Sequence, residues 1–157
     1  MVFEYYKYEP SKDFYELYNL FRLAFPNSKH LIKNPVTYQS YLNWLYLDNP
    51  LGLPVGYNAY CEGKLVGHYA CIPLNWSYEN KIYRALLSLN TAVHPNFRRK
   101  GLFSELAEKT YKFAKKEGFD FVYGVSNSNS THGFMKLGFC LVGELYLQLC
   151  VLPSFKN

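Results

Sequence analysis

The chain has 157 residues, of which 49% are hydrophobic and 18% charged, and its formal net charge is +5. This length suits one domain, the composition excludes a disordered chain, and the positive charge suits an anionic partner such as a phosphate. The N-terminus lacks a basic stretch before an apolar core, and Glu144 and Gln148 interrupt the longest apolar run. We therefore expect a cytoplasmic protein without a signal peptide or a membrane partner.

The four cysteines are Cys61, Cys71, Cys140 and Cys150. No two of them have the close spacing that is typical of zinc ligands. Each lies in an apolar stretch, which favours buried, reduced thiols over disulfides. The sequence therefore predicts neither a metal site nor a disulfide framework.

The first third of the chain predicts one strand and two helices. Residues 2–8 are rich in aromatic and β-branched side chains, as strands are. Apolar residues then recur at helical spacing after Ser11 or Asp13, either of which can cap a helix. Asn34 and Pro35 predict the start of the second helix, because Asn caps and Pro suits the first turn.

The middle of the chain predicts three antiparallel strands joined by tight turns. The strands are expected at residues 57–61, 65–78 and 82–93. Pro73 lies within the long second strand of this group. Since proline cannot donate a backbone hydrogen bond, it indicates a bulge or a sheet edge there.

The last third predicts two helices and two further strands. An amphipathic helix is expected from Leu102 to the C-terminal cap Gly118. A short buried strand follows at 119–125, then a short helix at 131–137. A last strand is expected from Gly138 to about Cys150. This mixture predicts an α+β fold with helices packed on a mixed sheet.

The segment between Asn90 and Phe103 carries the clearest chemical signal. A strand ends, a turn follows with a run of three basic residues at 98–100, and a helix begins directly after Gly101. Free N–H groups at a helix start favour an anion, and Gly101 lets a phosphate approach the backbone. The layout suits a pyrophosphate, although it matches neither a Walker loop nor G-x-G-x-x-G. An ordinary solvated turn is the alternative.

Residues 93–103 read V-H-P-N-F-R-R-K-G-L-F, and residues 127–139 read N-S-N-S-T-H-G-F-M-K-L-G-F. The first segment resembles V-x-P-x-[FY]-[RQ]-x-x-G-[IL]-[GA], a signature of the GNAT superfamily of acetyl-CoA-dependent N-acetyltransferases. It departs from that signature only at Phe103. The second segment is similar to the family signature N-x-x-A-x-x-x-[YF]-x-K-x-G-F. The resemblance implies one GNAT-like domain over residues 1–157, with a CoA-binding core at about 82–142.

The resemblance also implies the architecture of the sheet. It predicts a mostly antiparallel twisted sheet of about six to seven strands, splayed between strands four and five and flanked by about four helices. The family's seventh strand has no evident counterpart after Cys150. A trimmed fragment, an irregular last strand and a strand supplied by a partner all remain open.

Acetyl-CoA is the cosubstrate that the resemblance implies. The backbone of Ala92 and Val93 would hydrogen-bond the pantetheine arm, and Asn127 would lie near it where the strands splay. The loop before the third helix would cradle the pyrophosphate. The residues expected to contact the cosubstrate are Ala92, Val93, Arg98, Arg99, Lys100, Gly101, Leu102, Phe103, Asn127, Ser130 and Phe134.

The chemistry implied is direct acetyl transfer to a primary amine of a small molecule. It requires positioning of the reactants, removal of an amine proton, an oxyanion donor and protonation of the thiolate. A backbone N–H near Val93 is the donor that the resemblance implies. Many relatives protonate the thiolate with a tyrosine at the position of Phe134. Tyr123, Ser128 and Ser130 are candidate substitutes.

The general base is not evident from the residues. Alternation along the strand at 82–93 predicts that one face carries Arg84, Leu86, Ser88, Asn90 and Ala92. Ser88 and Asn90 could then face the acceptor or order a water. Glu144 could serve as a base if it were buried in the last strand, and an exposed Glu is the alternative. The candidate catalytic residues are therefore Asn90, Ser88, Tyr123 and Glu144.

Histidines could supply a base, but those at 68, 94 and 132 are expected to be structural or solvent-exposed. The acceptor is also open. Residues 44–50 resemble a segment of GNAT proteins that act on sugars or antibiotics, which makes an amino sugar one candidate. The aromatic residues at 38–46 are either core or the wall of an acceptor cleft.

Two rival functions remain: a catalytically silent acyl-CoA-binding module and a nucleic-acid-binding domain. A missing tyrosine at position 134 motivates the first. The second would use the basic triplet, but the other cations are scattered rather than gathered in a stripe, so no nucleic-acid partner is expected. Both a monomer and a homodimer are compatible with the sequence.

Overall fold

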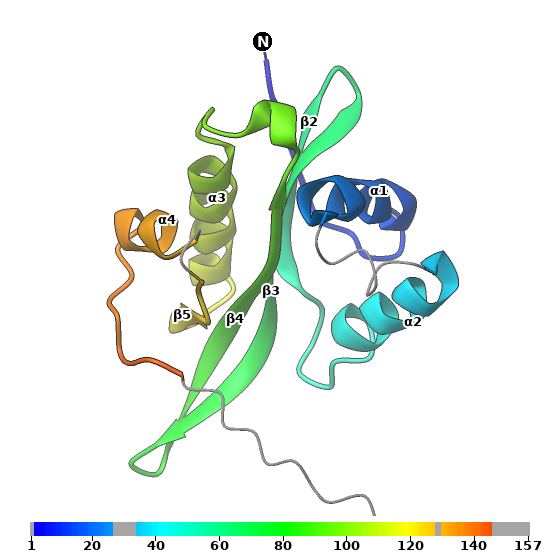
Figure 1. Cartoon of the computed structure of the whole chain (residues 1–157). Helices are drawn as coiled ribbons and strands as arrows, with labels where there is room; N and C mark the ends of the chain where they lie inside the picture. The colour runs from blue at the N-terminus through cyan, green and yellow to red at the C-terminus, as the bar shows by residue number, and fades with distance from the viewer. Residues whose placement is uncertain (1, 27–33, 128–129, 146–157) are drawn as a thin grey trace, which may run out of the picture.

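The computed structural model describes residues 2–26, 34–127 and 130–145. In this part of the chain, five strands form one sheet and four α-helices pack on it (Figure 1). The strands are β1 (Glu4–Lys7), β2 (Val55–Cys61), β3 (Lys64–Tyr78), β4 (Lys81–Val93) and β5 (Phe121–Gly124). The helices are α1 (Phe14–Ala24), α2 (Pro35–Tyr46), α3 (Leu102–Lys116) and α4 (Thr131–Lys136), and a short 3₁₀ helix, η2, covers Pro95–Phe97.

The sheet is mixed and mostly antiparallel. Its strand order follows the sequence, β1-β2-β3-β4-β5. The first three neighbouring pairs are antiparallel, whereas β4 and β5 are parallel. A parallel pair needs a crossover connection, and α3 supplies it between these two strands.

The helices cover the two faces of the sheet in pairs. Helices α1 and α2 lie on one face, and α3 and α4 lie on the other (Figure 1). Leu17, Phe21 and Tyr46 are fully buried on the α1–α2 side, and Leu102 and Leu106 on the α3 side. Burying such side chains stabilises the fold by about 1.5–3 kcal/mol each, so two cores sandwich the sheet.

Helix α2 begins as its sequence predicts. The Asn34 side-chain oxygen accepts hydrogen bonds from the N–H groups of Val36, at 2.9 Å, and Thr37, at 3.4 Å. Pro35 occupies the first turn, where its missing N–H costs nothing. This cap fixes the start of the helix and therefore the position of its buried face.

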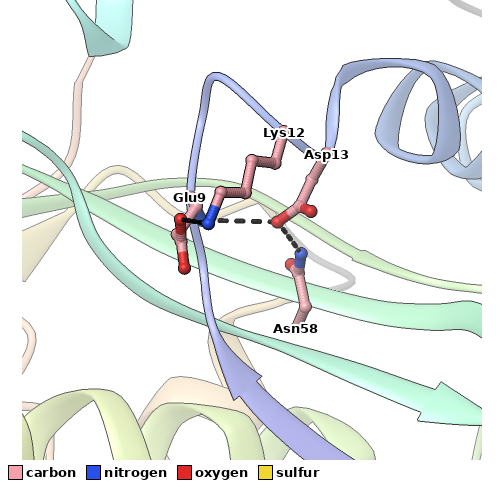
Figure 2. A network of polar contacts seen from close by, with 4 residues as sticks. All are labelled: Glu9, Lys12, Asp13 and Asn58. Atoms are coloured by element: carbon pink, nitrogen blue, oxygen red, sulfur yellow. Dashed lines mark hydrogen bonds and ion pairs between the residues drawn. The ribbon is translucent and has the colours of Figure 1, made fainter.

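Helix α1 starts differently, because the carboxylate of its N-cap residue is used elsewhere. The Asp13 side chain accepts from the Asn58 amide on β2 at 2.9 Å and from the N–H of Glu9 at 3.3 Å, as Figure 2 shows. Lys12 pairs with the Glu9 carboxylate beside it. Asp13 thus ties the start of α1 to the sheet rather than capping the helix with its side chain.

The expected six or seven strands are not found, since the described residues contribute five. The strand expected from Gly138 to about Cys150 is irregular over residues 139–145, and residues 146–150 lie outside the described part. Leu141, Val142 and Leu145 are exposed. An apolar segment becomes a strand only when its backbone pairs with a sheet edge, and residues 139–145 do not pair with β5.

Pro73 lies at a sheet edge, which is one of the two positions its sequence predicts. The β2–β3 pairing ends at Cys71, so Pro73 lies in a part of β3 that no longer pairs with β2. The Pro73 carbonyl accepts instead from the Asn49 side chain at 3.2 Å. No ladder N–H is needed there, which is why proline is tolerated.

The cysteines are only partly as expected. Cys61 and Cys71 are buried free thiols, but Cys140 is exposed because the segment that carries it does not join the sheet. Cys150 lies outside the described residues. Among the helices that the structure describes, none is long and apolar enough to cross a membrane.

Candidate active site

The sheet opens between its two parallel strands. Strand β4 pairs with β5 only from Ala85 to Ser88, and the last pair joins Ser88 to Gly124. Residues 89–93 of β4 continue to pair with β3, through contacts such as that of Ala92 with His68. Strands four and five therefore separate after Ser88, in agreement with the splay between these strands that the family resemblance implies.

A β-bulge in β4 lies directly beyond this point. His68 pairs with Ala92 but Ala70 pairs with Leu89, so Asn90 and Thr91 together oppose the one residue between them on β3. Asn90 has φ of +52°, a left-handed conformation that asparagine adopts more readily than most residues. An extra residue in one strand of a pair bends that strand and shifts the alternation of its side chains.

The bulge overturns the predicted face of β4. Leu86 packs in the core under α3, whereas Ala92 packs in the core under α1 and α2. Ser88 hydrogen-bonds on the α3 side, while the Asn90 amide donates to the Tyr46 hydroxyl of α2 at 3.1 Å. The expectation that Ser88 and Asn90 share a face is therefore wrong, because strict alternation ends at the bulge.

The backbone of Val93 faces the opening. The N–H of the next residue, His94, donates to Val66 of β3 at 2.9 Å. Since the backbone groups of successive strand residues point to opposite edges, those of Val93 point away from β3. A main-chain donor thus lies on the side of β4 from which β5 has separated.

The loop after β4 presents backbone amides before α3. Arg99 and Gly101 both have left-handed conformations, with φ of +62° and +82°. Such residues turn successive N–H groups into a concave surface that favours anions. Gly101 is the N-cap of the 15-residue helix α3, and no side chain caps the helix start. The N–H groups and the positive end of the helix dipole are therefore available to an anionic ligand.

The basic triplet divides between two environments. The Arg98 guanidinium donates to the carbonyl of Ala24, at 3.0 Å, and to that of Val93, at 3.4 Å. Its side chain therefore ties the end of α1 to β4, although the sequence predicts a role on a phosphate. The side chains of Arg99 and Lys100 are exposed, and the Lys100 ammonium lies 5.2 Å from the centre of the Phe97 ring.

Phe103, which stands where the family signature has a small residue, packs between α3 and α4. Its ring contacts those of Tyr69 and Phe134, with centroids 5.9 and 5.5 Å apart. A Cβ atom at Gly133 would lie only 2.8 Å from Cε1 of Phe103. The large Phe103 side chain is thus accommodated because residue 133 is a glycine, and α3 and α4 still pack against each other.

The connection from β5 to α4 is held by its own polar side chains. The Ser130 N–H donates to the Asn127 side-chain oxygen at 3.2 Å, and the Asn127 N–H donates to the Ser130 hydroxyl at 3.1 Å. These two predicted cosubstrate contacts are therefore neighbours just beyond the opened end of β5. The candidate Ser128 lies outside the described residues.

The other candidate acids and bases do not gather at the opening. The Tyr123 ring packs on Trp76, near the end of β3, with centroids 5.1 Å apart, and burial raises the pKa of the Tyr123 hydroxyl. Glu144 is exposed in the irregular segment after α4, so its expected place in a strand is wrong. His132 is exposed, and His94 accepts from the N–H of Asn96.

His68 is a buried structural histidine, as expected. Its Nδ1 lies 2.7 Å from the Asn58 side-chain oxygen, and the Tyr8 and Phe21 rings pack against it. Burial lowers the pKa of His68 to about 3, so the imidazole is neutral. Since Asn58 also donates to Asp13, this histidine belongs to the polar group that joins β2, β3 and α1.

Two tyrosines linked to Ser88 belong to no motif in the sequence. The Tyr69 hydroxyl lies 2.7 Å from the Ser88 hydroxyl and 2.6 Å from that of Tyr111 on α3. Burial raises the pKa of both tyrosines. These contacts depend on the β3–β4 pairing and on the packing of α3 against β3, so no local sequence pattern could have revealed them.

Comparisons with known proteins agree with this architecture. The family model described as an acetyltransferase (GNAT) domain matches residues 6–141. An aminoglycoside acetyltransferase from an uncultured soil metagenomic sample has a TM-score of 0.72 and 20% identity, covering 98% of this chain and 100% of its own. No curated protein sequence matches the chain.

Two further solved structures have the same fold. A predicted acetyltransferase from Clostridium acetobutylicum, crystallised with acetyl-CoA, has a TM-score of 0.72 and 20% identity, covering 95% of this chain and 96% of its own. Glucosamine-6-phosphate N-acetyltransferase from Arabidopsis thaliana has a TM-score of 0.66 and 16% identity. The match covers 95% of this chain and 99% of the Arabidopsis chain. With the family model spanning most of the chain, the protein belongs to the GNAT acetyltransferase family.

Proposed function

We propose that the whole chain, residues 1–157, is one domain that transfers an acetyl group from acetyl-CoA directly to a primary amine of a small molecule. The observation that carries this proposal is the opening after the Ser88–Gly124 pair, with the backbone of Val93 directed into it. Beside it, α3 starts without a side-chain cap after the left-handed residue Gly101. The opening beside Val93 thus suits the thioester, and the start of α3 suits the pyrophosphate.

Acetyl-CoA would be held mainly by main-chain groups. The family uses this cosubstrate, and the Clostridium acetobutylicum neighbour was crystallised with it. The N–H groups between Arg99 and Phe103 would bind the pyrophosphate, with Arg99 and Lys100 adding positive charge. The backbone of Val93 would pair with the pantetheine arm, whereas the backbone of Ala92, also expected to contact the arm, points toward β3, where it pairs with His68. Asn127, Ser130 and Phe134 would border the arm from the other side.

The reaction needs little from side chains. A neutral amine attacks the thioester carbonyl, a tetrahedral oxyanion forms, and the thiolate departs as the amide is completed. The Val93 N–H would stabilise the oxyanion, because it is a donor directed into the opening rather than toward β3. The Asn90 side chain is bound to Tyr46, so its contribution would be to hold the bulge that sets this geometry.

The acceptor that the observations favour is an amino sugar. Two neighbours of this fold are named for aminoglycoside and glucosamine-6-phosphate acetylation. On α2, the Tyr41 and Trp44 side chains are 42% and 63% exposed, and their ring centroids lie 6.1 Å apart. Exposed aromatic faces suit the apolar faces of sugar rings, so this pair would form part of an acceptor wall.

Calorimetry and a thiol-release assay test the proposal together. The chain is titrated with acetyl-CoA, and amines of several classes are then screened for release of free thiol. Binding combined with thiol release for amino sugars is the expected result, and absence of binding at millimolar acetyl-CoA would remove the proposal. Binding without release for any amine would instead favour a silent acyl-CoA-binding module, the alternative that the missing hydroxyl at Phe134 motivates.

A further inference from the structure

Three hydroxyl groups form a continuous chain from the opening of the sheet to α3. The Ser88 hydroxyl lies 2.7 Å from that of Tyr69, which lies 2.6 Å from that of Tyr111. Ser88 and Tyr69 are buried, whereas Tyr111 is only half-buried. The chain therefore runs from an interior position to the outer part of the α3 layer.

The position of Ser88 connects this chain to the opening. Ser88 belongs to the last pair that joins β4 to β5, and its partner is Gly124. A Cβ atom at Gly124 would lie 3.4 Å from the Cβ of Ser88. Because Gly124 has no side chain, β5 does not cover the Ser88 side chain at the point where β4 and β5 separate.

Hydroxyls in such a chain can pass a proton along. Each hydroxyl both donates and accepts, and in both contacts either oxygen can be the donor. Leu86, Leu102 and Leu106 are fully buried in the same core, where the buried Cys71 thiol also hydrogen-bonds to Tyr69 and Ser88. Phenylalanine at 69 and 111 would fill such a core without any polar group, so hydroxyls there need a reason beyond packing.

The position in α4 at which many relatives carry a tyrosine hydroxyl is occupied here by Phe134. The Phe134 ring packs between those of Phe103 and Phe139, with centroids 5.5 and 4.9 Å away. Building on the proposed function, we propose that the chain Ser88–Tyr69–Tyr111 delivers the proton that neutralises the departing CoA thiolate. Ser88 is its inner end and the catalytic residue, while Tyr69 and Tyr111 act through it.

The proton transfers balance as follows. When the C–S bond breaks, its electron pair stays on sulfur, and the sulfur takes the proton of the Ser88 hydroxyl. Ser88 regains a proton from Tyr69, Tyr69 from Tyr111, and Tyr111 from water. The amine has meanwhile released one proton to water, so no net charge remains. Burial raises the pKa of Tyr69 and Tyr111, so both hydroxyls stay protonated and neither forms a lasting anion, and the protons therefore move along the chain together.

The test compares Tyr111→Phe, Tyr69→Phe and Ser88→Ala with Tyr57→Phe, a control in the same core. For each variant we would measure acetyl-CoA affinity by calorimetry, and kcat against pH with the best acceptor. Loss of a general acid lowers rates by about 10²–10⁴-fold in enzymes. We expect a fall of at least about tenfold in kcat for the three variants, an altered pH profile, and acetyl-CoA affinity within about twofold of the wild type.

Ser88→Thr guards against a purely structural effect. It keeps the hydroxyl and should recover most of the kcat that Ser88→Ala loses, even if a tyrosine variant folds poorly. If the three variants keep the kcat and pH profile of Tyr57→Phe while the wild type transfers acetyl groups, the hydroxyl chain has no such role. A wild type that neither binds acetyl-CoA nor releases thiol would instead end the proposed function itself.

Discussion

The two halves of β4 have different surroundings. From Ala85 to Ser88 the strand is paired on both edges, with β3 and with β5. From residue 89 to Val93 it pairs only with β3 among the described residues, and it contains the bulge at Asn90. A doubly paired strand has no free backbone groups, so between Ala85 and Val93 only the second half can bind a ligand by main-chain atoms.

The second half is therefore held in place by other contacts. His68 beneath Ala92 hydrogen-bonds to Asn58, the Tyr46 hydroxyl accepts from Asn90, and Arg98 donates to the carbonyl of Val93. Each of these contacts can be removed singly. The resulting variants distinguish groups that hold the strand from groups that would bind a ligand.

The largest effect is expected from pH, through His68. The folded chain lowers the pKa of His68 to about 3, whereas an unfolded histidine has its ordinary value of 6.5. Between these values only the unfolded state binds the proton, so the free energy of unfolding falls as pH drops below 6.5 and levels off near 3. The loss by pH 3 is about 4 kcal/mol. Urea unfolding between pH 7 and pH 5, where most carboxyls remain charged, measures its first part.

A matched histidine provides the control for this pH dependence. His132→Gln, at an exposed position, should leave the slope unchanged, whereas His68→Gln should flatten it. Equal slopes in the wild type and in His68→Gln would mean that the imidazole is not neutral in the folded chain.

Two arginines, one next to each half of β4, allow the two halves to be tested separately. Arg84, directly before the first half, donates to the carbonyls of Glu117 and Gly118 at the end of α3. Arg98, after the second half, donates to Ala24 at the end of α1 and to Val93. Both are partly open to solvent, so we expect each Ala variant to lower the free energy of unfolding by about 1 kcal/mol.

Only Arg98→Ala should also weaken acetyl-CoA binding, because the Arg98 contact fixes Val93 at the opening. Thermal unfolding and calorimetry on both variants decide this. Equal acetyl-CoA affinity in the two variants would argue that the second half of β4 does not form the binding edge.

Some of this arrangement could be predicted from the sequence, because it depends on local signals. The start of α2 follows from Asn34 and Pro35, and the start of α3 follows from Gly101 and the amphipathic run after it. The separation of strands four and five was available only through the resemblance to a known family. Propensity and periodicity alone do not place two strands in parallel.

The rest depends on contacts between distant residues. The bulge at Asn90 is set by the register with β3, and it moves Asn90 and Ala92 to the other face from Ser88. Tyr69 meets Tyr111 across 42 residues, and neither lies in a signature. The apolar residues around Glu144 predict a strand, but strand formation also needs a partner edge.

Gly101→Ala should act on the ligand more than on the fold. A left-handed φ costs a non-glycine residue about 1–2 kcal/mol, and the added methyl group would also lie where a phosphate approaches the backbone. Gly63→Ala is the matched control, because Gly63 has φ of +71° in the β2–β3 turn and open space around it. Both variants should lose similar stability, but only Gly101→Ala should weaken acetyl-CoA binding, by about tenfold. Equal affinities would place the pyrophosphate elsewhere.

The smallest effect is expected from Tyr46→Phe, which leaves the buried ring and removes only the hydroxyl that accepts from Asn90 at 3.1 Å. Losing this hydrogen bond should cost about 1 kcal/mol of unfolding free energy. The bulge would then be less firmly held, so kcat should fall by a few-fold while acetyl-CoA affinity changes little. Tyr38→Phe, at another buried tyrosine of the same core, should leave kcat unaltered. If both variants keep full activity, the Asn90 side chain stabilises α2 against the sheet and does not set the geometry of the reaction.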